Sequence, residues 1–563
     1  MSNLHPALVF FAGALLVAML RGRTQALAAL LVPVVSAWSA FQLAPGTEIS
    51  ISIFQYELLP FRVDKLSLLF SHLFHIAAFL TLLFAWEAGD RLQRVTGLLY
   101  AGSALLALFA GDLITLFIAW ELLAVTSVFL IWARGTERAN RSGMRYLIIQ
   151  ISSGVILLAG AIIYFRETGS LAFGEIGTVT LGGKLILLAF GIKAAFPFLH
   201  AWMIDAYPEA TPAGAVFLSS FTTKTAIYAL ARAFAGEEIL IFIGVVMAAL
   251  PIFFAVIEND LRRVLAYSLN NQLGFMVVGV GIGTPLALNG TVAHAFCHVL
   301  YKSLLFMSMG AVLYRVGHVR GSDLGGLYKS MPFTAVFCII GAASISAFPL
   351  FSGFVSKSLI VAAVLHEHHI FVWMVLLFAS AGVFHHAGIK VPFFAFFSHD
   401  SGIRVKEAPK SMLLAMGIGS ALCIGLGCFP QFLYALLPWP VDYTPYTGTH
   451  VLTQTQLLFF SALAFTWLKL THLYPPELRA VHLDADWIYR RALPATARGV
   501  AMLAERVRLF GEGIAHSFVS GLQQAGRHHL GPDGIFGRTW ATGSIAVWVA
   551  ILLVIYLIFE YGA

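Results

Sequence analysis

The sequence predicts an all-α polytopic membrane protein with about 14–16 transmembrane helices. The chain has 563 residues, of which 59% are hydrophobic and 11% are charged, whereas about 25% are charged in ordinary soluble domains. Its mean hydropathy is +0.84. Apolar segments long enough to cross a bilayer, which takes about 20 residues, follow one another along most of the chain. A transmembrane β-barrel is excluded, because barrel strands are short and alternate polar with apolar residues.

The apolar segments continue to about residue 472, and one more lies at 541–560. Two of the expected spans lie near residues 354–376 and 378–398. Met1–Phe10 lacks a basic n-region, so we expect the first helix to remain rather than to be removed as a signal peptide. Residues 47–58 alternate in part with period two, which predicts a short external hairpin strand.

Basic residues gather in alternate loops between the expected helices. The net charge is +7, from 35 basic and 28 acidic residues. By the positive-inside rule this pattern places the N-terminus outside the cytoplasm and the chain in the inner cell membrane, and it explains the charge without nucleic-acid binding. The basic loops carry Arg21 and Arg23; Arg91 and Arg94; Arg134, Arg138, Arg141 and Arg145; Arg262 and Arg263; Arg315 and Arg320.

No motif for a cofactor, metal or catalytic site is found. The four cysteines lie in apolar segments and form no CxxC pair. Gly279, Gly281 and Gly283 mimic a nucleotide loop, but no strand precedes them. We therefore expect no bound cofactor or metal, and a secondary transporter subunit rather than an enzyme; redox-driven transport is expected only as part of a larger complex.

Residues 476–538 differ from the preceding chain, with eight Arg and no Lys. Apolar residues recur there every three or four positions, which predicts an amphipathic helix. Such a helix lies in the membrane interface or packs along other subunits, and an ordinary surface helix is the alternative. The stripe consists of Val500, Leu503, Val507, Phe510, Ile514, Phe518 and Leu522.

Two similar segments suggest an internal repeat with broken helices. Gly191–Phe198 (GIKAAFPF) resembles Gly388–Phe394 (GIKVPFF), and each places a lysine in an apolar run shortly before a proline. Proline removes a backbone hydrogen bond and breaks a helix. Paired interrupted helices in the two halves of a transporter mark its ion site.

Several charged residues lie within apolar segments, where a charge costs at least about 2.5–3.5 kcal/mol on insertion scales. Glu121 stands near the middle of its span, and Lys193 is the expected cation partner. A Glu–Lys pair whose separation changes can take up or release a proton. Lys224 is a third buried charge, for which snorkelling to the interface is the alternative to a relay role.

His294, His298 and Lys302 are spaced by four residues, so they share one helix face. Histidine exchanges protons near neutral pH, and this stack predicts a proton path, with metal binding as the rival interpretation. Lys390 is expected to end the relay in the second half. His385 and His386 could extend the proton path or lie at a helix end, and Lys357 is expected at a helix start. Asp205, Glu209 and Asp260 are expected in loops near the membrane surface, where Asp260 forms a cluster with Arg262 and Arg263.

At these residues the sequence resembles the proton-pumping antiporter-like subunits shared by Mrp cation/proton antiporters, respiratory complex I and membrane-bound hydrogenases. The strings at 205–210 and 221–228 look closest to the D subunit of Mrp-type Na⁺/H⁺ antiporters, whereas the amphipathic stretch resembles the lateral helix of the largest antiporter-like subunit of complex I. The supporting strings are Phe196–Trp202, Asp260–Ser268 with Gln272–Gly274, and His294–Lys302.

The resemblance implies two inverted five-helix repeats and a relay formed by Glu121, Lys193, Lys224, His294, His298, Lys302 and Lys390. It also implies partner membrane subunits. We accordingly divide the chain into N-terminal helices with an external hairpin loop (1–92), a first inverted repeat (93–235), a second inverted repeat (236–400), C-terminal helices (401–475), the amphipathic interfacial segment (476–538) and a final transmembrane helix (539–563).

The predicted function is proton translocation coupled to sodium or another monovalent cation, in a multisubunit antiporter embedded in the lipid bilayer. The alternative is a proton-pumping membrane subunit of a complex I-like or hydrogenase redox complex. A membrane scaffold whose buried charges move no ions is a third possibility.

Overall fold

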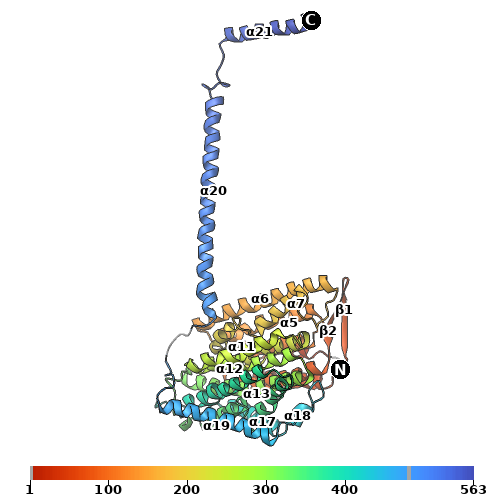
Figure 1. The fold of residues 1–563 in the computed structure, drawn as a ribbon, viewed down its shortest axis with the longest axis vertical. Helices are drawn as coiled ribbons and strands as arrows, with labels where there is room; N and C mark the ends of the chain where they lie inside the picture. The colour runs from red at the N-terminus through yellow and green to blue at the C-terminus, as the bar shows by residue number, and fades with distance from the viewer. Residues whose placement is uncertain (1–3, 479–482, 563) are drawn as a thin grey trace. The chain divides into compact units, whose positions relative to one another are not determined.

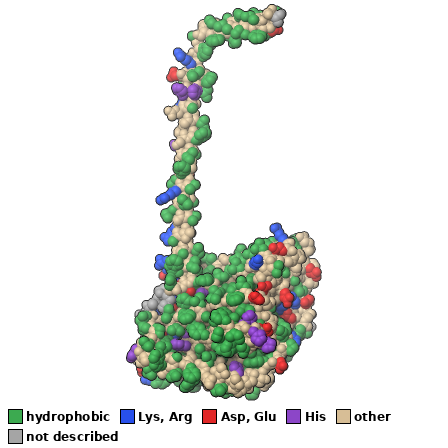
Figure 2. Space-filling model, in the orientation of Figure 1, with side chains coloured by type: hydrophobic (Ala, Val, Ile, Leu, Met, Phe, Trp, Pro, Cys, Tyr) green, Lys and Arg blue, Asp and Glu red, His purple; other side chains and the backbone are tan. Residues whose placement is uncertain are grey.

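The structure is a computed structural model that describes residues 4–478 and 483–562, and it divides into two compact units, 1–485 and 486–563. The first unit is a bundle of helices that run alongside one another (Figure 1). In the described part of the chain, 11 helices are long and apolar enough to cross a membrane. Hydrophobic side chains cover much of the visible side of this bundle (Figure 2). The predicted all-α polytopic fold is confirmed.

The chain begins with helices α1 (Pro6–Met19) and α2 (Gly22–Phe41), a hairpin, and α3 (Lys65–Ala88). Strands β1 (Glu48–Ile53) and β2 (Tyr56–Arg62) pair antiparallel, which confirms the hairpin and extends it beyond residue 58. Asp64 caps α3 by accepting a hydrogen bond from the Ser67 backbone amide, at 2.8 Å. The hairpin therefore leads directly into a well-defined helix start.

The next group of helices contains two interruptions. Helix α7 ends at Lys193 and α8 starts at Ala201; between them Ala195 and Phe198 have φ values of 63° and 65°. These left-handed conformations cannot continue a right-handed helix. The second interruption falls at Phe221, between α9 and α10. The elements are α4 (Arg91–Phe109), α5 (Leu113–Trp132), α6 (Glu137–Thr168), α7 (Leu181–Lys193), α8 (Ala201–Ala206), η1 (Tyr207–Glu209), α9 (Pro212–Ser220) and α10 (Thr222–Ala233).

A third interruption lies in the following group. Helix α14 ends at Ile345 and α15 begins at Ser352, and Ala347 and Leu350 have φ values of 57° and 75°. Residues 354–376 were expected to form one span but are divided between α15 and α16. The elements are α11 (Ile239–Ile257), α12 (Leu261–Ile282), α13 (Pro285–Val316), η2 (Leu327–Lys329), α14 (Pro332–Ile345), α15 (Ser352–His366), α16 (Ile370–Val383), η3 (Phe384–Lys390) and η4 (Phe393–Phe397).

The structure corrects the expected pair of broken helices. Gly388–Lys390 lies in a π-helical stretch of one continuous element, Ile370–Phe397, and Pro392 does not break it. The wider π turn shifts the hydrogen-bond register, so that a proline is accommodated. The counterpart of Ala195–Phe198 (AFPF) is instead Ala347–Leu350 (AFPL), which has left-handed residues at the same two positions.

The first unit continues through α17 (Lys410–Cys428), α18 (Gln431–Tyr434) and α19 (Gly448–Leu470) and ends at Ala485. The described residues 476–478 and 483–485 fall within this first unit. The second unit contains η5 (Ile488–Ala492), α20 (Leu493–Leu530) and α21 (Thr542–Tyr561). Helix α20 contains the predicted apolar stripe, and α21 lies within the expected final span.

Helix α13 forms the core of the bundle, since the most apolar window of this 32-residue helix is entirely buried. It packs against α9, α12, α14, α15 and α17. Side chains of α13 are therefore shielded from lipid on every side, which allows polar residues to occupy it.

Helices α11 and α12 pack so closely that the backbone of one contacts glycines of the other. A Cβ on Gly274 of α12 would lie 2.4 Å from the Ala248 backbone nitrogen of α11. We predict that Gly274→Ala forces the helices apart and destabilises the protein by about 1–3 kcal/mol. Thermal unfolding in detergent should show a lower Tm than for wild type.

The matched control is Gly425→Ala in α17, where a Cβ meets no atom within 4 Å. This substitution should leave Tm unchanged or raise it, because alanine favours a helix. Equal Tm values for the two variants would contradict the proposed close packing.

Candidate functional site

Glu121 and Lys193 are brought together at the first helix break. Lys193 is the last residue of α7 and fully buried, and its ammonium donates a 2.8 Å hydrogen bond to the Trp120 carbonyl oxygen of α5. The same ammonium lies 4.4 Å from the centroid of the Trp120 ring. Lys193 therefore contacts the residue that precedes Glu121, with the cation over an aromatic face.

The Glu121 carboxylate lies against α6. A Cβ on Gly154 would be 1.6 Å from Glu121 Oε1, so only glycine leaves room for this carboxylate. Among the described residues, Glu121 Oε1 is buried with no hydrogen-bond partner. A buried carboxylate oxygen without a partner is a place for a proton or a water molecule.

Lys224 lies beside the break at Phe221. Its ammonium donates to the Ser219 carbonyl oxygen at 2.6 Å and to Thr223 Oγ1 at 3.2 Å. The Ser219 carbonyl is available because α9 ends at Ser220. Lys224 is fully buried and does not snorkel to the surface.

Hydroxyl groups connect this region to α13. Ser220 Oγ of α9 lies 3.0 Å from Ser303 Oγ, the neighbour of Lys302. The Lys302 ammonium donates to Ser268 Oγ of α12 at 3.0 Å and to the Leu265 carbonyl oxygen at 3.3 Å. The serine pair thus lies next in sequence to the residues that contact Lys224 and to Lys302 itself, between α9 and α13.

His294 belongs to a hydrogen-bonded network across three helices. Its Nδ1 lies 3.1 Å from Ser356 Oγ of α15, and its Nε2 lies 3.2 Å from Gln272 Oε1 of α12. The Tyr301 hydroxyl donates to the same Gln272 oxygen at 3.1 Å. Such a network fixes the histidine ring while hydroxyl groups remain free to rotate.

Among His294, His298 and Lys302 of α13, His298 has the fewest hydrogen bonds. It is fully buried, and neither ring nitrogen has a hydrogen-bond partner in the described part of the chain. Its ring centroid lies 6.2 Å from that of His294 and 5.3 Å from that of Tyr301. Since buried polar atoms are nearly always paired, a water molecule is expected beside this imidazole.

Lys357 lies beside the interruption between α14 and α15, much as Lys193 lies at the interruption between α7 and α8. It stands near the start of α15, as expected, and its ammonium donates to the Ile345 carbonyl oxygen at 3.1 Å and to Ser380 Oγ at 3.5 Å. A cavity of about 340 Å³ borders Lys357 and extends to Tyr443 and His450 in the loop and helix start after α18. The sequence analysis predicted only that Lys357 lies at a helix start. The interruption between α14 and α15 cannot be recognised from the pattern of charged residues.

Lys390 is held at the end of α11. Its ammonium donates to the carbonyl oxygens of Ala255, Val256 and Glu258 at 3.3, 2.6 and 2.6 Å. It also forms an ion pair with Glu477 Oε1 at 3.0 Å. The sequence gave no signal for Glu477, which lies in irregular backbone after α19.

Other charges at this end of the bundle correct the sequence-based expectation. Asp205 lies in α8 rather than in a loop, is buried, and pairs with Arg145 at 2.6 Å. Glu209 is also buried and pairs with Arg138 at 3.0 Å. These carboxylates therefore join the first turns of α6, which contain Arg138 and Arg145, to the α8 region.

The cluster of Asp260 with Arg262 and Arg263 is not wholly at the surface. Arg262 is only 1% exposed, and its guanidinium donates to carbonyl oxygens of Pro208, Ala210 and Thr211 at 3.0–3.1 Å. The Thr211 carbonyl also accepts from the Ala215 backbone amide at the start of α9, and the planar guanidinium contacts several of these carbonyls at once.

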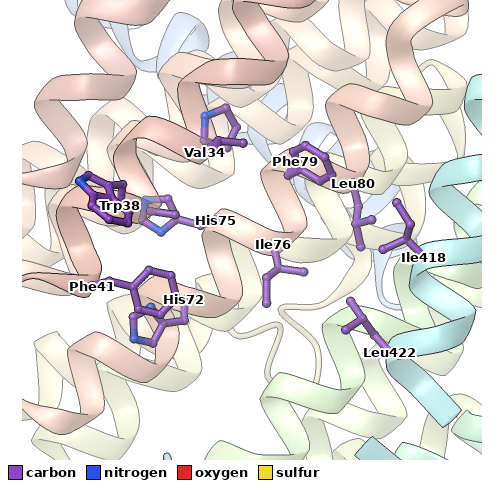
Figure 3. Close-up of a pocket in the computed structure, with 12 residues that line it drawn as sticks. Val34, Trp38, Phe41, His72, His75, Ile76, Phe79, Leu80, Ile418 and Leu422 are labelled. Carbon is purple, nitrogen blue, oxygen red and sulfur yellow. The ribbon is translucent and has the colours of Figure 1, made fainter. Parts of the chain in front are cut away.

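A separate apolar groove of about 480 Å³ lies between α2, α3 and α17 (Figure 3). His75 contributes to its lining but is already paired, with Nε2 2.8 Å from Ser36 Oγ and Nδ1 2.6 Å from the Ser71 carbonyl oxygen. Its lining contains no lysine or carboxylate, so this groove is distinct from the row of buried charges.

A bundle of membrane-spanning helices with lysines and histidines buried through its centre defines an antiporter-like membrane subunit. Residues 110–384 match the sequence profile of the family described as "NADH:quinone oxidoreductase/Mrp antiporter, TM". The matched range contains Glu121, Lys193, Lys224, His294, His298, Lys302 and Lys357, and it ends before Lys390.

Characterised relatives come from two kinds of complex. The chain is 28% identical over 358 residues to the D subunit of the Na(+)/H(+) antiporter of Alkalihalophilus pseudofirmus, in a match that covers 59% of this chain and 71% of the relative. It is also 28% identical over 419 residues to hydrogenase-4 component B of Escherichia coli, in a match that covers 66% of this chain and 62% of the relative.

Solved structures share the fold. A chain of the Mrp complex from Dietzia sp. DQ12-45-1b matches with a TM-score of 0.66 and 21% identity, over 81% of this chain and 95% of that one. A chain of the archaeal membrane-bound sulfane sulfur reductase matches with a TM-score of 0.71 and 22% identity, over 98% of this chain and 99% of that one.

Proposed function

We propose that the chain is the proton-translocating subunit of a multisubunit monovalent cation/proton antiporter of the Mrp type, with Na⁺ as the exchanged cation. It acts in the bacterial cell membrane together with other membrane subunits. The observation that carries the proposal is that several fully buried groups contact carbonyl, hydroxyl or amide oxygens instead of carboxylates: Lys193, Lys224, His294 and Lys302.

The energetic argument concerns ammonium groups in a low-dielectric interior. Each buried ammonium loses hydration that an ion pair would partly replace. Lys224, Lys302 and Lys357 are each hydrogen-bonded to one backbone carbonyl and one hydroxyl oxygen. Such groups are stabilised enough to persist, yet they can release a proton at modest cost, which is what a relay requires.

In this mechanism Glu121 and Lys193 form the central charge pair of the first half. Protons pass through Lys224 and Lys302 by way of the serine hydroxyls, and His298 and His294 extend the path along α13. Lys357, which borders the 340 Å³ cavity, and Lys390, at the end of α11, give the relay two separate positions for exchange with the two sides of the membrane.

A second candidate function is a proton-pumping membrane subunit of a redox complex. It is favoured by the similarity to hydrogenase-4 component B and by the fold shared with the sulfane sulfur reductase. The same relay would operate, but electron transfer in partner subunits would drive it. Purification of the intact complex distinguishes the two: iron–sulfur or flavin subunits support the redox complex, and membrane subunits alone support the antiporter.

We predict that Glu121→Gln and Lys193→Ala each lower the transport rate by about tenfold or more, because removal of either charge raises the barrier to proton transfer by at least ~1.4 kcal/mol. The measurement is Na⁺-dependent dissipation of a pH gradient in everted vesicles that contain the whole complex.

Lys184→Ala and Glu238→Gln are the controls, since both side chains are exposed and the first lies on the same helix as Lys193. Both controls should transport at wild-type rates. Wild-type transport by Glu121→Gln or Lys193→Ala in a normally assembled complex would refute the relay.

Gly154→Ala provides a test that removes no charge. The new Cβ would lie 1.6 Å from Glu121 Oε1, so the carboxylate must move. We expect transport to fall several-fold while the complex assembles normally, because alanine is otherwise favourable within a helix.

Ser152→Ala, at an exposed position of the same helix, is the control and should behave as wild type. If Gly154→Ala leaves both the rate and its pH dependence unchanged, the position of the Glu121 carboxylate does not matter for transport.

A further inference from the structure

The ion pair between Lys390 and Glu477 joins two segments that are distant in sequence. Glu477 follows α19, whereas Lys390 lies in the π-helical stretch η3. The Lys390 side chain is fully buried and that of Glu477 is 5% exposed. Both residues belong to the first unit, so their contact is part of one compact body.

The carboxylate is not required as a hydrogen-bond acceptor for Lys390. An ammonium group has three N–H donors, and the carbonyl oxygens of Ala255, Val256 and Glu258 already accept from it. Glu477 therefore supplies negative charge rather than a missing hydrogen bond.

The Glu477 carboxylate is itself poorly satisfied. Apart from the ion pair with Lys390, neither of its buried oxygens accepts a hydrogen bond within the described residues. A buried carboxylate oxygen without a donor is costly unless it holds a proton or a water molecule. Burial raises the pKa of the Glu477 carboxyl above its ordinary value, while the neighbouring Lys390 and Lys469 oppose this rise and Glu258 adds to it.

Two further unpaired polar groups lie beside this pair. The Tyr474 hydroxyl and His385 Nε2 are buried without partners in the part of the chain that the structure describes. Their rings are 5.5 Å apart, and both contact the Phe465 ring of α19. Lys469 lies 5.5 Å from the Tyr474 ring centroid. The cluster of Lys390, Glu477, Tyr474 and His385 thus needs water molecules to complete its hydrogen bonds.

We propose that Glu477 is a proton-relay residue that exchanges protons with Lys390 at the end of the bundle where α11 and α19 terminate. The Lys390 ammonium transfers one proton to the Glu477 carboxylate, which leaves a neutral amine and a carboxylic acid. The acid then releases its proton to water, and Lys390 is reprotonated from the relay. The inference rests on the proposed function and extends it to a residue outside the two predicted repeats.

The test compares Glu477→Gln and Glu477→Asp in the whole complex, with Glu505→Gln as control. Glu505 is an exposed carboxylate of α20 paired with Arg508, so its neutralisation should have no effect. Glu477→Gln keeps the size and an acceptor oxygen but cannot exchange a proton. We expect it to lower Na⁺-dependent pH-gradient dissipation by about tenfold, with normal assembly.

Glu477→Asp retains a titratable group and should keep transport, with the acidic limb of the pH profile shifted to lower pH because aspartate has the lower ordinary pKa. A merely structural ion pair predicts the reverse order, with Gln tolerated and the pH profile unmoved.

Wild-type transport by Glu477→Gln overturns the proposal. If that variant does not assemble, an unshifted pH profile for Glu477→Asp overturns it instead. Glu121→Gln is measured in parallel, and wild-type transport by this variant refutes the proposed function. If Glu121→Gln is inactive while Glu477→Gln is fully active, only the role of Glu477 is refuted.

Discussion

The physical constraint on which this structure depends is that an ammonium group buried at membrane depth needs oxygen atoms around it. Carbonyls within regular helices already accept one backbone hydrogen bond, and Lys193 and Lys302 share such carbonyls at Trp120 of α5 and Leu265 of α12. Helix ends and breaks free carbonyl oxygens, and Lys224, Lys357 and Lys390 each donate to such oxygens, at Ser219, Ile345 and the end of α11. The helix ends and interruptions therefore supply acceptors for three of the buried lysines.

Neutral polar groups connect the charged ones. Ser220 and Ser303 bridge α9 and α13, and Gln272 accepts from Tyr301 while lying beside His294. A hydroxyl group can reverse its direction as donor or acceptor by rotation, so it can pass a proton without carrying net charge.

The sequence predicts the fold and the buried charges well, because both depend on apolar context. Glu121, Lys193 and Lys302 stand out within apolar runs, and the structure buries both lysines completely. The interruption between α14 and α15 could not be located from Gly388–Lys390. The effect of Pro392 on its helix depends on the π-helical register around it. The left-handed residues Ala347 and Leu350 that make the break have no characteristic side chain.

Glu477 escaped prediction for a related reason: it follows two prolines in irregular backbone, where a single glutamate is usually exposed. Only the three-dimensional packing brings it to Lys390. The apolar residues around Lys390 therefore identify this lysine as buried. The sequence around Glu477 does not distinguish it from a surface residue.

The second unit differs from the first because its long helix α20 has an exposed apolar stripe instead of buried charges. Helix α20 has 38 residues, so it extends on the order of 57 Å at 1.5 Å per residue. Its stripe residues Val507, Phe510 and Phe518 are 64–72% exposed, whereas Arg508 pairs with Glu505 and Glu512 outside that stripe. An apolar stripe of this length is stable only when lipid or other protein covers it. Because a multisubunit membrane complex supplies both, the amphipathic helix is accounted for by the same assembly that the relay requires.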